Sequence, residues 1–241
     1  MNEEKFIDVA GIGVVKFVRN RRARNIAVRI NRDGDVRVTV PGNIPVRVAE
    51  AFVEKKKSWI LSTRERLISR KEDRIIWGTD SKLQIKQYII TIRLKEDNSS
   101  SYKVKRESDS FILYIPGGKE PEREEIQEEI RTELWKIITL IGKEVLPLRT
   151  RELADRHGLK FKEVKVRKMK SRWGSCSAAN VINLSSSLLL LPDHLADYVI
   201  LHELAHTVHK DHSRKFWSYL DRLTGDSVSL RRELRKAVLR V

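Results

Sequence analysis

The chain has 241 residues, enough for one large domain or two smaller ones, and its single cysteine, Cys176, excludes an internal disulfide and a cysteine-rich metal cluster. No stretch approaches the roughly 20 apolar residues of a membrane span, and the N-terminus lacks a signal-peptide pattern, so we expect a cytoplasmic protein that does not enter membranes. The net charge of +16, concentrated in residues 16–37 and 160–172, favours anionic partners and weak, salt-sensitive nucleic-acid binding, or else marks only a solvated basic surface.

The first predicted elements are a β-hairpin and a helix. Residues 26–30 and 36–40 alternate apolar and polar side chains around a turn at 31–34, which is typical of two paired strands. After Pro41-Gly42, apolar residues recur at helical spacing from 46 to 68, which predicts an amphipathic helix.

Further strands are predicted in the middle of the chain. Residues 82–94 and 102–115 alternate in the same way, and the polar segment 96–101 separates them as a loop. Pro116-Gly117-Gly118 then marks a break. We therefore expect residues 1–118 to form a small, mainly β domain with one helix.

The second half is predicted to mix helices with a small sheet. A long helical pattern covers 122–156, with Pro147 expected to kink or split it. Short strands are expected within 161–170 and 181–188, around the turn-prone segment 171–180. We detect no internal repeat and expect one further domain, 119–241, so that the whole chain is of the α+β class.

A buried helix after Pro192 carries the clearest chemical motif. Within the mostly apolar run HLADYVILHELAHTV lies His202-Glu203-Leu204-Ala205-His206, an HExxH sequence. Its two histidines are four residues apart and therefore project from one helix face, where both imidazoles can reach one ion. Two buried histidines without a metal are the alternative, because HExxH also arises by chance.

Zinc suits this motif because imidazole nitrogen is a favoured ligand, and a catalytic site needs three protein ligands with one open position. The metal lowers the pKa of water, and Glu203, next to His202 on the helix, can accept its proton as the water attacks a carbonyl. We therefore expect one zinc ion per chain and a hydrolytic reaction.

The sequence around the motif resembles a known family. The run HELAHTVHKDHSRKFW, preceded by SRWGSCS at 171–177 and INLS at 182–185, is similar to the YgjP-like metal-dependent hydrolases, which are related to SprT-like and WLM metallopeptidases. The resemblance implies a zincin-like fold, with the active-site helix on a small sheet and a separate N-terminal domain. It also implies His202, His206 and His212 as metal ligands and Glu203 as catalytic base.

Helix geometry bears separately on the choice between His209 and His212 as third ligand. In a continued helix His202 and His209 lie about 10.5 Å apart along the axis, whereas each zinc-bound nitrogen lies about 2.0–2.1 Å from the ion. A chain that leaves the helix near His209 can turn back through Lys210 and bring His212 to the metal. This geometry favours His212.

Four further residues are candidate contacts for substrate. Arg172 can bind an anionic group near the metal, or can instead pair with a structural carboxylate. Asn183, Leu184 and Ser185 belong to a predicted strand that can accept a peptide as an edge strand, provided that it is not an interior strand with both edges paired.

Three functions remain compatible with the sequence. A metallopeptidase acting on peptides or proteins is the leading hypothesis, and a metal-dependent hydrolase of nucleotides or other phosphoanhydrides is the second, since basic residues flank the motif. The third is a nucleic-acid-binding protein with a structural metal, which would not require Glu203.

Overall fold

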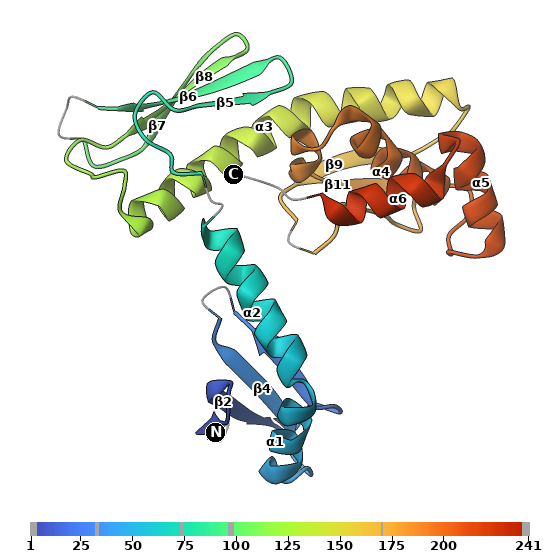
Figure 1. The fold of residues 1–241 in the computed structure, drawn as a ribbon. Coiled ribbons are helices and arrows are strands. Elements are labelled where there is room, and N and C mark those ends of the chain that lie inside the picture. The colour runs from blue at the N-terminus through green and yellow to red at the C-terminus, as the bar shows by residue number, and fades with distance from the viewer. Residues whose placement is uncertain (1–3, 32–33, 73–74, 96–98, 170, 238–241) are drawn as a thin grey trace. The chain divides into compact units, whose positions relative to one another are not determined.

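The chain divides into two compact units, residues 1–74 and 75–241, each with its own hydrophobic core (Figure 1). The computed structural model describes residues 4–31, 34–72, 75–95, 99–169 and 171–237. This division lies earlier than the boundary expected at 118, because the strands between 82 and 115 share one core with the long helix that follows them. The α+β class is confirmed.

The first unit contains a four-stranded sheet in the order β1-β2-β4-β3. The central pair, β2 and β4, is parallel, and both outer pairs are antiparallel. The predicted hairpin is confirmed as β3 and β4, although residues 32–33 of its turn lie outside the described residues. The sequence analysis assigned no strands to β1 and β2. The strands are β1 (Glu4–Val9), β2 (Gly13–Asn20), β3 (Ala27–Ile30) and β4 (Val36–Pro41).

Two helices, α1 (Val46–Lys55) and α2 (Lys57–Glu72), complete this unit. The single helix predicted over 46–68 is interrupted at Lys56, where the backbone departs from helical geometry with φ −100° and ψ 6°. Apolar side chains from both helices and from the sheet are inaccessible to solvent, which gives this unit a core independent of the rest of the chain. The fully buried members are Val15, Val38, Ala49, Val53 and Ile60.

The second unit opens with another four-stranded sheet, in the order β5-β6-β8-β7. Its central pair, β6 and β8, is parallel and its outer pairs are antiparallel, so it repeats the topology of the first sheet. The fourth strand of each sheet also runs into a Pro-Gly pair, Pro41-Gly42 and Pro116-Gly117. The two sheets therefore share a strand order that the search of the sequence for internal repeats did not reveal. The strands are β5 (Lys82–Ile85), β6 (Tyr88–Leu94), β7 (Lys103–Glu107) and β8 (Ser110–Ile115), and residues 96–98 of the predicted loop lie outside the described residues.

A 33-residue helix, α3 (Glu124–Arg156), joins this sheet to the rest of the second unit (Figure 1). Its buried positions recur every three or four residues, so that one apolar stripe contacts β8 near one end and the later strands and helices near the other. The helix continues through Pro147 and is not split there. Side chains of α3 belong to one core together with those of both sheets of the second unit, which explains why the unit does not divide near residue 118.

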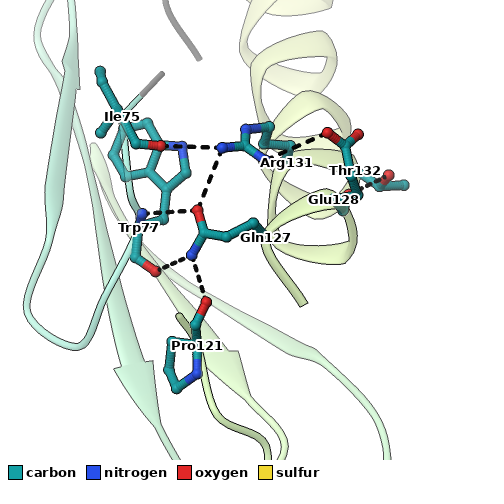
Figure 2. A network of polar contacts seen from close by, with 7 residues as sticks. All are labelled: Ile75, Trp77, Pro121, Gln127, Glu128, Arg131 and Thr132. Atoms are coloured by element: carbon teal, nitrogen blue, oxygen red, sulfur yellow. Dashed lines mark hydrogen bonds and ion pairs between the residues drawn. The ribbon is translucent and has the colours of Figure 1, made fainter. Parts of the chain in front are cut away.

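A buried polar network fixes the start of the second unit to α3 (Figure 2). The Gln127 amide accepts from the Trp77 backbone N–H at 3.0 Å and donates to the carbonyl oxygens of Trp77 at 2.8 Å and Pro121 at 2.6 Å. Arg131 donates to the Ile75 carbonyl at 3.2 Å. Because Gln127 is only 2% exposed, these bonds satisfy backbone groups that water cannot reach.

The remaining elements form a three-stranded sheet in the order β10-β11-β9, with helices packed on it. β11 pairs antiparallel with β10 and parallel with β9, and α4 contacts both β10 and β11. Among the described residues, no helix is long and apolar enough to cross a bilayer. The elements are β9 (Glu163–Arg167), β10 (Gly174–Cys176), β11 (Val181–Ser185), the 3₁₀ helix η1 (Ser186–Leu190), α4 (Asp193–Ala205), α5 (Arg214–Thr224) and α6 (Ser227–Lys236).

Candidate metal centre

Helix α4 positions three of the predicted site residues. It is apolar around most of its circumference and buries nine of its residues, as its sequence predicts. His202 and Glu203 lie in its last turn, and His206 is the first residue beyond it. The HExxH motif is thus held by a rigid, buried element.

The chain then turns back and brings His212 to the same point. Helix α4 ends at Ala205, and the Thr207 and Val208 backbone N–H groups close the turn onto carbonyls of its last two residues. His212 Nε2 lies 3.2 Å from His202 Nε2 and 3.2 Å from His206 Nε2. His209 is not part of this group, and its ring lies against Tyr219 instead.

The spacing of these nitrogens fits a shared cation. Two nitrogens that are each about 2.0–2.1 Å from one zinc ion at the tetrahedral angle lie about 3.3 Å apart. His202, His206 and His212 offer ligand atoms that all lie within 4.8 Å of one another. In the part of the chain that the structure describes, no fourth histidine, cysteine or carboxylate joins them, which leaves a coordination position open.

Neighbouring groups orient the imidazoles. His206 Nδ1 lies 2.9 Å from the His209 carbonyl oxygen, and a donated Nδ1–H there leaves Nε2 as the lone-pair nitrogen that faces the other histidines. Helix α5 supplies Phe216, stacked on His206 with ring centroids 4.4 Å apart, and Trp217, stacked on His212 at 5.7 Å. Sequence analysis left these two aromatic residues out of the site.

Burial favours the neutral form of two of the three histidines. Burial, with the neighbouring His206 and His212, lowers the pKa of His202 to about 3, and burial also lowers the pKa of His206. Metal ligands must be unprotonated, so this environment favours metal binding over protonation at neutral pH.

Glu203 lies beside the histidines with an unsatisfied oxygen. The residue is 5% exposed, and among the described residues its Oε2 has no hydrogen-bond partner. Burial raises the pKa of Glu203 to about 8, while Arg172 acts in the opposite direction. A buried carboxyl group without a partner is costly, and a cation held by the three histidines would offset that cost.

Comparison with known families assigns the chain to one of them. A family model described as YgjP-like, metallopeptidase domain, matches residues 24–237. The chain belongs to the YgjP-like family. It is accordingly a metal-dependent hydrolase, and the three histidines form a group that can hold its ion.

Two solved structures also show similarity to this YgjP-like chain. The metallopeptidase zymogen of Pyrococcus abyssi abylysin is 23% identical, covers 39% of this chain and 96% of its own length, and has a TM-score of 0.32. The metallopeptidase zymogen of Methanocaldococcus jannaschii jannalysin is 21% identical, covers 37% of this chain and 94% of its own, and has a TM-score of 0.31. No curated protein sequence matches the chain.

The edge strand beside α4 is not the strand that the sequence analysis considered for peptide binding. β11 is paired on both sides, and its Leu184 and Ser185 side chains are buried, so Asn183, Leu184 and Ser185 do not form an edge that can accept a peptide. Of the two alternatives, the interior strand is the one observed. The edge strand next to α4 is β10, which sequence analysis assigned to a turn-prone segment.

Strand β10 also touches Glu203. A Cβ atom added to Gly174 would lie 2.7 Å from both Cγ and Oε1 of Glu203, closer than real Cβ contacts occur. Gly174 is therefore required for the close approach of this strand to the carboxyl group. No sequence pattern indicated this, because the two residues are brought together only by the packing of β10 on α4.

A pocket in this YgjP-like domain opens beside the motif. Its volume is about 310 Å³, and Arg172 lines it together with His202 and Glu203, so the structure places Arg172 near the candidate site. Sequence analysis missed the contribution of helix α6, because nothing local to that helix indicates what it packs against. The other lining residues are Trp173, Gly174, Tyr198, Val199, Arg231, Leu234 and Arg235.

Proposed function

We propose that the protein is a zinc-dependent peptidase in which His202, His206 and His212 hold one zinc ion and Glu203 is the general base. The observation that carries this proposal is the convergence of three imidazoles, with His212 Nε2 3.2 Å from the Nε2 atoms of His202 and His206, beside a buried carboxyl group whose Oε2 has no partner among the described residues. Zinc, when bound, acts as a Lewis acid towards a carbonyl group and activates water.

The chain's own groups have separate tasks in this proposal. Glu203 Oε2 accepts a proton from the attacking water and returns it to the leaving amine. The free edge of β10 offers backbone hydrogen bonds to an extended peptide, so that the peptide lies alongside Glu203. Phe216 and Trp217 stack on the imidazoles of His206 and His212 and keep these rings in the orientation that the metal requires.

A purely structural metal is disfavoured by two features. Structural zinc sites have four protein ligands, whereas only three converge in the described part of the chain. Such a site also gives no reason to bury Glu203 beside the ligands without a hydrogen-bond partner for Oε2.

The first test compares wild type with Glu203→Gln. The amide cannot accept a proton, so we expect Glu203→Gln to retain zinc and to lose roughly 10²- to 10⁴-fold in peptide hydrolysis. Peptide mixtures, nucleoside triphosphates and nucleic acid serve as parallel substrates, with zinc measured by elemental analysis. Normal hydrolysis by the zinc-loaded variant would remove Glu203 from the reaction, and a Glu203-dependent loss seen only with nucleotides would replace the peptidase assignment.

The second test examines the third ligand with a matched control. His212→Ala removes one converging nitrogen and should abolish stoichiometric zinc in the folded protein. His209→Ala keeps the backbone carbonyl that accepts from His206 and should retain the metal. The reverse result in the two folded variants would exchange the roles of these histidines.

A further inference from the structure

The pocket beside the metal centre concentrates positive charge from two separate parts of the second unit. Arg172 precedes β10, whereas Arg231 and Arg235 belong to α6, and all three line the same space. Within the described residues, no carboxylate forms an ion pair with any of them. The one acidic side chain in the lining is Glu203.

Interactions within α6 do not account for the two arginines that it contributes. Arg231 and Arg235 are four residues apart on one helix, where like charges repel and destabilise a helix slightly. The position of Arg235 in the last turn suits the helix dipole, but Arg231 lies in the middle of α6 and gains nothing from it. Glu233, on the same helix, pairs with His194 and therefore does not neutralise them.

Arg231 also packs against an aromatic ring. Its guanidinium lies over the Trp217 ring, 4.7 Å from the centroid, and Trp217 stacks in turn on His212. A guanidinium that packs over an aromatic ring can keep its N–H edges available, and those edges match the two oxygens of a carboxylate. The Trp217 ring thus contacts both the Arg231 guanidinium and the His212 imidazole.

The rest of the lining is apolar. Trp173, Tyr198, Val199 and Leu234 contribute walls beside the arginines, and Tyr198 is almost fully buried. At about 310 Å³ the pocket is at the small end of the range of about 300–1,000 Å³ for ligand sites. It suits a short aliphatic stem that ends in an anionic group.

We propose that this pocket binds a substrate carboxylate next to the scissile bond and thereby makes the enzyme selective for peptides that carry a carboxylate at that position. The carboxylate comes either from an Asp or Glu side chain or from the free C-terminus of the peptide. The inference rests on the proposed peptidase function and names the substrate class of that same site.

Binding of three labelled peptides to zinc-loaded Glu203→Gln protein tests the proposal without turnover. All three have the same length and neutral sequence. The first has a central Glu and an amidated C-terminus, the second a central Gln and a free C-terminus, and the third a central Gln and an amidated C-terminus. At least one of the first two should bind about tenfold more tightly than the third, and their order identifies the source of the carboxylate.

Two further substitutions separate the pocket from the general positive charge of the protein. Arg231→Gln should abolish the preference for the carboxylate, whereas Arg232→Gln, an exposed neighbour outside the pocket, should leave it unchanged. If Arg231→Gln does not fold, Arg172→Gln takes its place. Equal affinities for the three peptides, or equal effects of Arg231→Gln and Arg232→Gln, would overturn the proposal.

Three outcomes distinguish a failure of this inference from a failure of the proposed function. Peptide hydrolysis by wild type without any preference for a carboxylate would overturn the inference alone. A carboxylate preference in binding, with no Glu203-dependent hydrolysis, would overturn the peptidase function and leave the anion pocket standing. A nucleoside triphosphate that binds through Arg231 while the peptides show no preference would reassign the pocket to phosphate and overturn the carboxylate proposal.

Discussion

Replacing Gly174 with alanine tests the contact between β10 and the proposed general base. The added Cβ would lie 2.7 Å from Glu203 Cγ and Oε1, whereas ordinary contacts begin near 3.4 Å, so the carboxyl group must retreat by about 0.7 Å. The three atoms nearest to the added Cβ all belong to the Glu203 side chain. The substitution therefore displaces one functional group by a known amount.

The expected effect is larger on catalysis than on stability. Misplacing a reacting group by about 1 Å costs roughly 100-fold, so we expect kcat to fall by about 30- to 100-fold. Overpacking of this kind destabilises a protein by about 1–3 kcal/mol, which leaves the unit folded. Zinc content should not change, because the three atoms nearest to the new methyl group all belong to the Glu203 side chain.

Steady-state peptide hydrolysis, zinc analysis and thermal unfolding form the assay. Gly78→Ala is the matched control, since its added Cβ meets nothing within 4 Å and its φ is not positive. A Gly174→Ala enzyme with wild-type kcat would show that Glu203 does not act from the position observed. Loss of zinc in the same variant would instead mean that β10 supports the ligands and not the base.

Two further predictions concern the architecture of the second unit. Gln127→Leu should lower its free energy of unfolding by about 3 kcal/mol, measured in urea with the exposed Glu125→Ala as control, because the Trp77 and Pro121 backbone groups lose their buried partners. A change below about 1 kcal/mol would contradict the network in Figure 2. Residues 75–241 expressed alone should unfold in one cooperative transition and bind zinc like the full chain, since their core is separate from that of residues 1–74. A fragment that lacks cooperative unfolding by calorimetry would refute this division.

Local periodicity in the sequence was sufficient to predict much of the fold and the histidines of the candidate site. His202 and His206 project from one helix face because they are four residues apart, and the axial distance from His202 to His209 favours His212 as the third member of the group. The hairpin around residue 33 and the long helix α3 likewise follow from alternation and helical spacing. Such patterns depend only on neighbours along the chain.

Features that depend on distant neighbours were not predictable in this way. Gly174 meets Glu203, and Arg231 lines the same pocket as Arg172, only because separate elements pack together. The strand order that makes β11 interior depends on the same packing. The repeated topology of the two four-stranded sheets left little trace in sequence beyond the Pro-Gly pair after β4 and β8.

The continuous core along α3 has a thermodynamic consequence for metal binding. A ligand that binds only the native state stabilises every element that unfolds with its site, by about 4 kcal/mol when its concentration is 1,000 times Kd. The sheet β5–β8 packs on a helix about 50 Å long that also packs against α4, which carries two residues of the candidate metal centre, and all of these elements belong to one core. Zinc should therefore slow hydrogen exchange in β6 and β8 as well as in α4, and leave β2 and β4 of the first unit unprotected.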